Sequence, residues 1–207
     1  MPEDVPHRTR VIEKCAQHLR LIAAANEHMN LTRISTPQEA AIKHVFDSVA
    51  PWRYFEKARL VLDAGTGAGF PGIPLALALP EISFILSESV QKKARFVESS
   101  VESLGIANVE VLSERAETLA MVRQPDIITA RAVAPVDRLI DLFGRSLDRG
   151  ARLLLLKGPD VENELSIADQ RHFVADILGR YDLPDGLGSR TMVSVSSVQG
   201  RGRRSAS

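Results

Sequence analysis

The chain has 207 residues, 44% of them hydrophobic, and its 26 basic residues balance its 26 acidic residues. This length is enough for one well-packed domain. A neutral net charge neither suggests nor excludes a nucleic-acid partner, so any nucleic-acid site must be a local basic patch.

Several classes of protein and site are disfavoured from the start. The single cysteine, Cys15, excludes an intramolecular disulfide. The start of the chain is polar, and the longest apolar runs, 73–79 and 153–156, are far shorter than the roughly 20 residues that span a bilayer. The histidines are scattered and none has a cysteine or an acidic residue at metal-ligand spacing. We therefore expect a cytoplasmic protein with no membrane partner and no metal site.

Residues 1–58 are expected to form a helical extension. Apolar residues at near-helical spacing predict an amphipathic helix over about 11–29. A second helix is expected over 37–50, because Thr36 can cap it, a proline occupies its first position, and Glu39 lies three residues after the cap.

Residues 59–198 alternate short apolar strands with helical stretches, which is typical of a parallel sheet with crossover helices. The expected strands are 60–63, 82–88, 109–112, 126–130, 152–156, 173–181 and 192–198. The expected helices are 71–79, 92–104, 116–121, 136–145 and one after Val161. The sequence thus predicts a doubly wound, Rossmann-like α/β domain with a seven-stranded, mostly parallel sheet. The basic tail, 199–207, is expected to be disordered.

The strongest motif is the glycine-rich segment 63–72, Asp-Ala-Gly-Thr-Gly-Ala-Gly-Phe-Pro-Gly, which follows the first strand. Glycine allows the backbone to turn sharply and to approach a ligand closely. The dinucleotide fingerprint G-x-G-x-x-G is met by Gly67, Gly69 and Gly72. The methyltransferase pattern, an acid before three alternating glycines, is met by Asp63, Gly65, Gly67 and Gly69. The pattern by itself leaves both cofactors open.

The charge of Asp63 favours S-adenosylmethionine over NAD. A carboxylate about 4 Å from a pyrophosphate would be repelled by roughly 4 kcal/mol at an effective dielectric near 20, and a methionine ammonium would be attracted by a similar amount. No Gly-Lys-Ser/Thr follows the loop, which excludes a P-loop.

Two further strand ends suit a nucleoside. Glu88 lies about twenty residues beyond the loop, where an acid can bind ribose hydroxyls. Its alternative interpretation is a solvent-facing acid at a strand end. Ala116 and Glu117 follow the third strand, beside the expected adenine, although this segment alone would pass as a helix N-terminus.

Several segments together resemble one family, in the same order and at similar spacing. These segments are Asn26–Thr32, His44–Val49, Asp63–Pro74, Glu88–Lys93, Ser113–Glu117, Ala130–Ala132 and Leu156–Gly158. They resemble the bacterial small-subunit ribosomal RNA guanine-N7 methyltransferases, known as glucose-inhibited division protein B, over about 19–198. Ala25 stands where the family often has an aromatic residue, and Glu88 where it frequently has Asp.

The resemblance implies a class I S-adenosylmethionine methyltransferase fold and methyl transfer to N7 of one guanine in the 530 loop of 16S rRNA, with S-adenosylhomocysteine as product. It implies cofactor contacts by Gly65, Phe70, Ala116, Glu117 and Arg131. The family positions that surround the transfer site are matched by Arg115, Arg131 and Lys157, our candidate catalytic residues. The expected partner is 16S rRNA or the small ribosomal subunit, bound by a monomer.

The residue chemistry agrees with this reaction. Guanine N7 carries no proton, so its methylation requires in-line positioning and no general base. The motif expected for methylation of adenine N6 or cytosine N4, Asn/Asp-Pro-Pro followed by an aromatic residue, is missing after the fourth strand. The sequence there is Asp-Ile-Ile-Thr-Ala-Arg, residues 126–131. Cys15 lies on the expected N-terminal helix, away from the strand ends, which disfavours a cysteine adduct with a pyrimidine. These absences leave N7, ribose hydroxyls, small molecules and proteins as acceptors.

Polar residues elsewhere have two interpretations each. Arg131 ends the fourth strand, where it could hold a phosphate or the edge of a guanine, or order the cofactor site, although an isolated arginine would more often form a surface ion pair. His44, Asp47 and Ser48 share one helix face, which is either a wall of the site or a polar surface. Six cations could form a basic rim, or merely solvated helix faces, namely Lys92, Lys93, Arg95, Arg115, Arg131 and Lys157.

Two other functions remain open. One is a small-molecule or protein methyltransferase with the same cofactor domain, which would transfer methyl groups without RNA. The other is a non-catalytic nucleotide-binding module or an NAD-dependent oxidoreductase, which binding of S-adenosylhomocysteine or NAD would distinguish.

Overall fold

The computed structural model describes residues 1–207 except 35, 160, 169–171 and 199–207. The tail for which we expected disorder, 199–207, therefore lies outside the described residues. Within the described part, no helix is both long enough and apolar enough to traverse a membrane.

The described residues form one seven-stranded sheet in the order β3-β2-β1-β4-β5-β7-β6. Its strands are β1 (Leu60–Ala64), β2 (Ser83–Ser87), β3 (Val109–Leu112), β4 (Ile127–Arg131), β5 (Arg152–Lys157), β6 (Phe173–Asp182) and β7 (Ser189–Ser197). The first five strands are parallel, and β7 runs antiparallel between β5 and β6. The carboxyl ends of β1 and β4, which are neighbours, thus lie side by side at one edge of the sheet.

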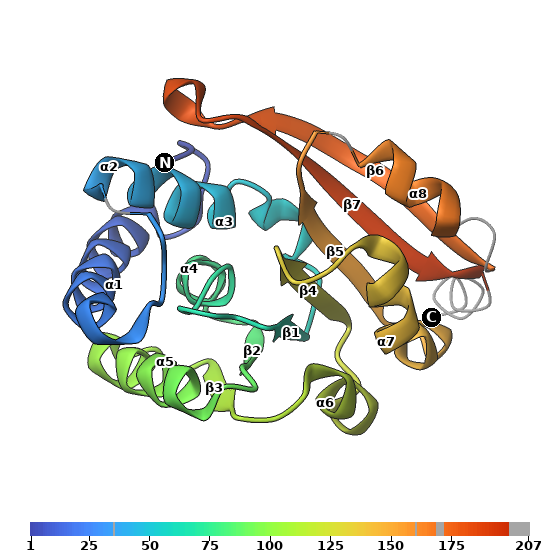
Figure 1. The fold of residues 1–207 in the computed structure, drawn as a ribbon, viewed down its shortest axis with the longest axis horizontal. Coiled ribbons are helices and arrows are strands. Elements are labelled where there is room, and N and C mark those ends of the chain that lie inside the picture. The colour runs from blue at the N-terminus through green and yellow to red at the C-terminus, as the bar shows by residue number, and fades with distance from the viewer. Residues whose placement is uncertain (35, 160, 169–171, 199–207) are drawn as a thin grey trace.

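Helices cover both faces of the sheet (Figure 1). They are α1 (Arg8–Met29), α2 (Pro37–Ala40), η1 (Ala41–Phe46), α3 (Asp47–Val49), η2 (Trp52–Tyr54), α4 (Gly72–Ala78), α5 (Gln91–Leu104), α6 (Ala116–Arg123), α7 (Val136–Asp148), α8 (Glu162–Ala168) and η4 (Pro184–Gly186). One apolar core lies where α1, α4 and α5 cover the sheet, and it includes Val11, Leu75 and Val97. A second core, with Leu139 and Phe143 of α7, fills the opposite face. Burial on both faces explains why the central strands read as continuous apolar runs.

The predicted seven-stranded α/β fold with a helical extension is confirmed, and the strand and helix boundaries lie within a few residues of those expected. The second predicted helix spans Pro37 to Val49, and the Oγ1 atom of Thr36 accepts a 3.3 Å hydrogen bond from the amide of Glu39. Its middle, η1, is a π-helix, a hydrogen-bond register that the cap and the proline do not predict. The amide of Asp47 bonds to the carbonyl of Ile42, five residues back.

Candidate active site

The glycine-rich loop joins β1 to α4 at the carboxyl edge of the sheet. Gly65, Gly67 and Gly69 have φ of +69°, +60° and +100°, a conformation that residues with a Cβ rarely adopt. A Cβ at Gly67 would meet nothing within 4 Å, whereas one at Gly72 would lie 2.1 Å from Leu86. Gly72 therefore serves packing, whereas Gly67 borders open space.

Asp63 lies beneath this loop and is fully buried. Its Oδ2 atom accepts hydrogen bonds from the Thr66 hydroxyl at 2.6 Å and from the Gly72 amide at 2.9 Å. Among the described residues Oδ1 has no hydrogen-bond partner. Burial raises the pKa of Asp63 to about 6. The carboxylate thus holds the loop in shape, and it lies below the loop rather than in the pocket wall.

A pocket of about 190 Å³ opens beside the loop, between the ends of β1, β2 and β3. Its lining includes Gly65, Ser87, Ser89, Arg115, Ala116 and Glu117. The structure thus brings Gly65 together with the predicted adenine-binding residues Ala116 and Glu117. Arg115 also belongs to this pocket, where it is largely exposed and lies 3.2 Å from the carboxylate of Glu117.

Glu88 connects the end of β2 to the glycine loop. Its Oε2 atom accepts a 3.2 Å hydrogen bond from the amide of Gly67, and its Oε1 atom accepts one of 2.8 Å from the amide of Val90. The side chain is buried. The alternative of a solvent-facing acid is therefore wrong, because the loop folds over this carboxylate.

Arg131, at the end of β4, is partly buried against η1 and α3 of the N-terminal helical segment. Its guanidinium donates a 2.8 Å hydrogen bond to the carbonyl of Lys43 and lies 3.3 Å from Nδ1 of His44. The π-helix makes the first of these bonds possible, because the amide of Asp47 bonds to Ile42 rather than to Lys43. Arg131 is therefore not a surface ion pair, and its position is fixed by main-chain and side-chain acceptors.

Three rings form a stack beside Arg131. The ring of His44 lies 4.7 Å from that of Phe70 at 10°, and the ring of His18 lies 5.1 Å from Phe70, tilted by 33°. Burial lowers the pKa of both His18 and His44 to about 4, and the positive charge of Arg131 adds to the effect at His44. Phe70 is also buried, so its side chain packs within this stack. Since Nδ1 of His44 faces a guanidinium donor, the neutral ring carries its proton on Nε2 and donates to Thr32 Oγ1 at 2.9 Å.

Asp47 joins Arg131 to the last two strands. Its Oδ2 atom lies 3.6 Å from Arg131 and accepts a 3.1 Å hydrogen bond from Nε of Arg190, and its Oδ1 atom accepts one of 3.0 Å from the Tyr181 hydroxyl. Asp47 and Ser48 are both buried, so the interpretation of a solvated polar helix face is wrong for them. Sequence reasoning missed Tyr181 and Arg190, because no local motif marks them.

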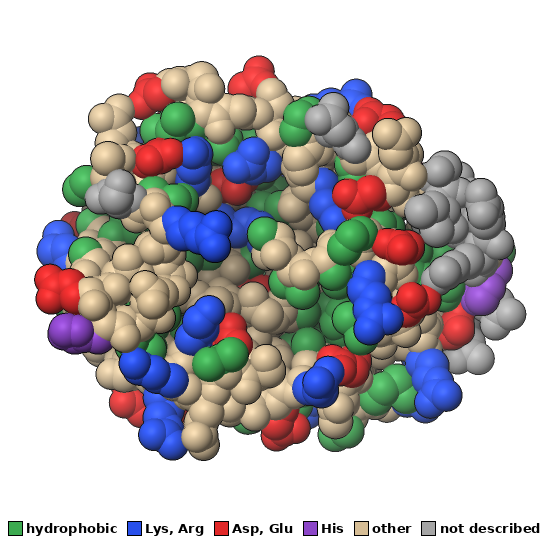
Figure 2. Space-filling model, viewed as in Figure 1, with side chains coloured by type: hydrophobic (Ala, Val, Ile, Leu, Met, Phe, Trp, Pro, Cys, Tyr) green, Lys and Arg blue, Asp and Glu red, His purple; other side chains and the backbone are tan. Residues whose placement is uncertain are grey.

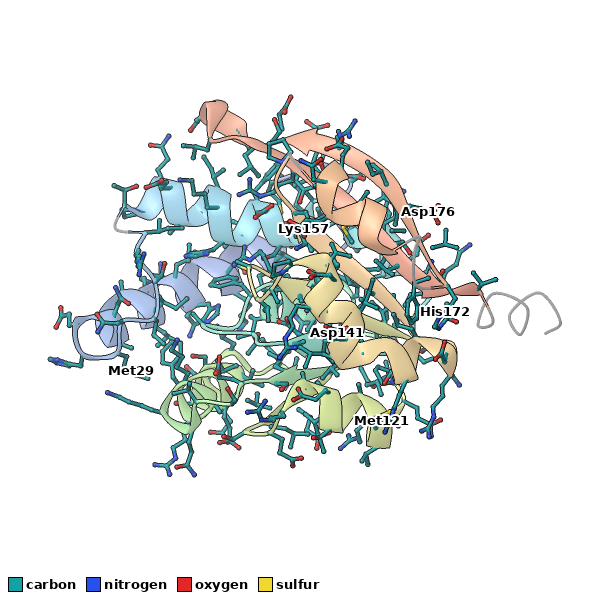
Figure 3. All side chains as sticks on the ribbon, turned by 45° about the vertical axis from the view of Figure 1, so that its right-hand side comes forward. Met29, Met121, Asp141, Lys157, His172 and Asp176 are labelled. Atoms are coloured by element: carbon teal, nitrogen blue, oxygen red, sulfur yellow. The ribbon has the colours of Figure 1, made fainter. Side chains whose placement is uncertain are left out.

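A second pocket, of about 390 Å³, lies next to this cluster. It is lined by Ile34, Lys43, His44, Asp47, Arg131, Ala132, Leu156, Lys157, Gly158 and Arg190. Lys157, labelled in Figure 3 at the end of β5, donates to the carbonyl of Ala134 at 2.9 Å and to Glu164 of α8 at 2.8 Å. The structure therefore places Arg131 and Lys157 in one pocket and Arg115 in the neighbouring one.

The six cations expected to form a rim are divided. Arg131 and Lys157 line the second pocket and Arg115 the first. Neither pocket is lined by Lys92, Lys93 or Arg95, and Lys92 reaches from α5 to the carbonyl of His28 at 3.1 Å. In Figure 2, Lys and Arg side chains gather around a hollow of this face between α3 and β5.

The described residues contain no group of three or more His, Cys, Asp or Glu side chains that could hold a metal ion.

The sheet order, the antiparallel β7 and the glycine loop together define the class I S-adenosylmethionine-dependent methyltransferase fold. Magnesium protoporphyrin IX methyltransferase from Synechocystis PCC 6803, solved with bound S-adenosylmethionine, matches with a TM-score of 0.61 and 17% identity over 87% of this chain and 97% of that chain. The O-methyltransferase TomG from Streptomyces achromogenes, also solved with the cofactor, has a TM-score of 0.58 and 20% identity over 87% of this chain and 90% of its own.

Sequence comparison then identifies the family. The family model described as GidB, rRNA small subunit methyltransferase G, matches residues 11–179. Ribosomal RNA small subunit methyltransferase G of Solibacter usitatus (strain Ellin6076) is 55% identical over 199 residues, which cover 94% of this chain and 95% of that relative. The protein of the same name from Carboxydothermus hydrogenoformans is 36% identical over 91% of this chain and 84% of its own. The chain belongs to this family.

Proposed function

We propose that this chain transfers the methyl group of S-adenosylmethionine to N7 of a guanine in the 530 loop of 16S rRNA, the guanine numbered G527. The observation that carries the proposal is the adjacency of two pockets at the carboxyl ends of β1 and β4. One borders the glycine loop, and the other contains the partly buried Arg131. Family membership supports the identity of the substrate.

The first pocket suits the cofactor. The open space at Gly67 lets a ligand approach the loop backbone, and Ala116 and Glu117 offer main-chain groups to an adenine. Glu88 would bind the ribose by exchanging its Gly67 contact for hydroxyl groups, and Asp63 would attract the methionine ammonium. When bound, the cofactor supplies an electrophilic methyl group on a positively charged sulfur.

The second pocket suits the acceptor. Guanine N7 attacks with a lone pair and loses no proton, so the neutral His44 is not required as a base. A hydrogen-bond donor on N7 would occupy that lone pair. We therefore assign Arg131 and Lys157 to the guanine O6 atom or to a phosphate, which orients the base and leaves N7 free. A base that enters this pocket has to leave its stack.

The deciding experiment is to map N7-methylguanine in 16S rRNA from cells with and without this protein. We expect loss of one methylated guanine in the 530 loop when the protein is missing and its return on complementation. Methyl transfer by the purified protein to a small molecule or a protein, with the rRNA unchanged, would favour the alternative acceptor class. Binding of NAD without binding of S-adenosylhomocysteine would contradict the cofactor assignment.

We further propose that the protein acts as a cytoplasmic monomer without a metal. Light scattering of the purified protein should give the mass of one chain, and a chelator should leave methyl transfer unchanged. A stable dimer or chelator-sensitive transfer would contradict these two expectations. Cell fractionation should recover the protein with the cytoplasm.

A further inference from the structure

The pocket that contains Arg131 has an unbalanced set of charges on its wall. Four cations line it, Lys43, Arg131, Lys157 and Arg190, and one carboxylate, Asp47. His44 also lines this pocket and is neutral at physiological pH, because burial lowers its pKa to about 4. The wall is therefore positively charged, unlike the chain as a whole.

The two lysines have carboxylates of their own, but the two arginines share one. Lys43 pairs with Glu39, and Lys157 pairs with Glu164, and both acids lie outside the pocket lining. Arg131 and Arg190 both face Oδ2 of Asp47, at 3.6 Å and 3.1 Å. Asp63 also attracts Arg131, but from beneath the glycine loop. An anion that enters the pocket would therefore complete the pairing of two guanidinium groups.

The guanidinium of Arg190 is held in one orientation and has donors left for an anion. Its Nε–H bonds to Asp47, and one N–H of Nη1 bonds to the carbonyl of Ser189 at 3.0 Å, so the plane of the guanidinium is fixed. A guanidinium has five N–H donors, which leaves further donors for a ligand. The side chain is 23% exposed, so these donors are accessible from the pocket. Fixed, forked donors match the oxygen atoms of a phosphate.

We propose that this pocket contains, beside the space for the target guanine, a phosphodiester-binding subsite in which Arg190 acts with Arg131 on the adjacent RNA phosphate. The proposal rests on the proposed function for the identity of the RNA. It assigns substrate binding to β7, a strand that belongs neither to the glycine loop nor to the N-terminal helical segment. Holding the phosphate here places the attached base at the end of β4, next to the cofactor pocket.

The test is Arg190→Gln in the full-length protein, assayed on small ribosomal subunits. We expect KM to rise on the order of tenfold, as for loss of a charge-assisted hydrogen bond, with little change in kcat. The slope of log binding constant against log salt, measured by direct binding to the subunits, should fall by about one. Arg190→Lys keeps the charge and should keep most of that slope. Unchanged affinity for S-adenosylhomocysteine would show that each variant is folded.

Two control variants separate charge from architecture. Tyr181→Phe removes another hydrogen bond to Asp47 but no charge, so its salt slope should equal that of the wild type. Arg180→Gln removes a cation from β6 that is exposed, pairs with Glu162 and does not line the pocket, so it should leave KM and slope unchanged.

Two results would overturn the inference: a wild-type KM and slope in Arg190→Gln, or an equal loss of slope in Tyr181→Phe. Failure of the wild-type protein to methylate the rRNA would instead refute the proposed function. The binding slopes do not depend on methyl transfer and still test the subsite.

Discussion

The guanidinium of Arg131 donates a 2.8 Å hydrogen bond to the main-chain carbonyl of Lys43, so the end of β4 is attached to the π-helical turn of the N-terminal segment. Arg131→Ala should therefore have two effects. Methyl transfer should fall by at least about a hundredfold, and the free energy of unfolding should fall by about 1–3 kcal/mol, because Lys43 and Asp47 lose a partly buried partner.

Initial rates on ribosomal subunits and urea unfolding measure these two effects. Arg131→Lys keeps the charge but not the forked donors. Compared with Arg131→Ala, it should therefore restore more of the free energy of unfolding than of the methyl-transfer rate. A wild-type rate in Arg131→Ala would exclude a role for this residue in transfer.

Gly67 and Gly105 provide a matched pair for testing the cofactor pocket. Their φ angles are +60° and +61°, and a Cβ at either position would meet nothing within 4 Å. Substitution of either glycine by alanine should therefore lower the free energy of unfolding by about 1–2 kcal/mol, because the backbone conformation is strained for a residue with a Cβ. Gly67→Ala should in addition raise the Kd of S-adenosylhomocysteine strongly, because the methyl group occupies the space of the ligand. Equal Kd values in the two variants, measured by calorimetry, would show that Gly67 does not border the cofactor.

Protonation of Asp63 should weaken cofactor binding. Since burial raises its pKa to about 6, the carboxylate loses its charge as the pH falls through about 6. The Kd of S-adenosylhomocysteine should then rise between pH 8 and pH 5. Asp63→Asn should bind more weakly at pH 8, by about 2 kcal/mol for an ammonium roughly 8 Å away at a dielectric near 20. The Kd of S-adenosylhomocysteine for Asp63→Asn should not change between pH 8 and pH 5. If the variant showed the same pH dependence as the wild type, the electrostatic role of Asp63 would be contradicted.

The ring stack should make the protein sensitive to acid. The folded protein holds the pKa of His18 and His44 at about 4, below the ordinary histidine value of 6.5, so the unfolded chain binds more protons between these values. The free energy of unfolding should therefore fall as the pH drops from about 6.5 to about 4. His18→Phe keeps a ring against Phe70 and should reduce this loss. His28→Phe, at an exposed position, should retain the wild-type loss in urea unfolding at each pH.

The fold was largely predictable because its signals are local. Alternating apolar strands and helices specify a doubly wound sheet, and Thr36 specifies the start of its helix. The π-helix at 41–46 was not predictable, since the Lys43 carbonyl that its register leaves available is bound by Arg131, 88 residues away along the chain. The cap and the proline predict a helix but not the hydrogen-bond register of its middle.

The two pockets differ in how far sequence reasoning could define them. The pocket at the glycine loop collects Gly65, Ala116 and Glu117, which short motifs identify. Asp47 meets Tyr181 and Arg190 across 134 and 143 residues, and no spacing rule connects them. The residues at the strand ends were therefore predicted, and those that β6 and β7 contribute were not.

The antiparallel strand β7 also determines the order in which the two pockets can form during folding. The pocket at the glycine loop draws its lining from residues 64–143, whereas the other pocket needs both Ile34 and Arg190. Closing the longer loop costs more chain entropy and is slower. A chain emerging N-terminus first exposes every residue of the cofactor pocket before Arg190 has been made. The proposed methyl donor site can thus form early, and the proposed RNA site is complete only when the last strand pairs.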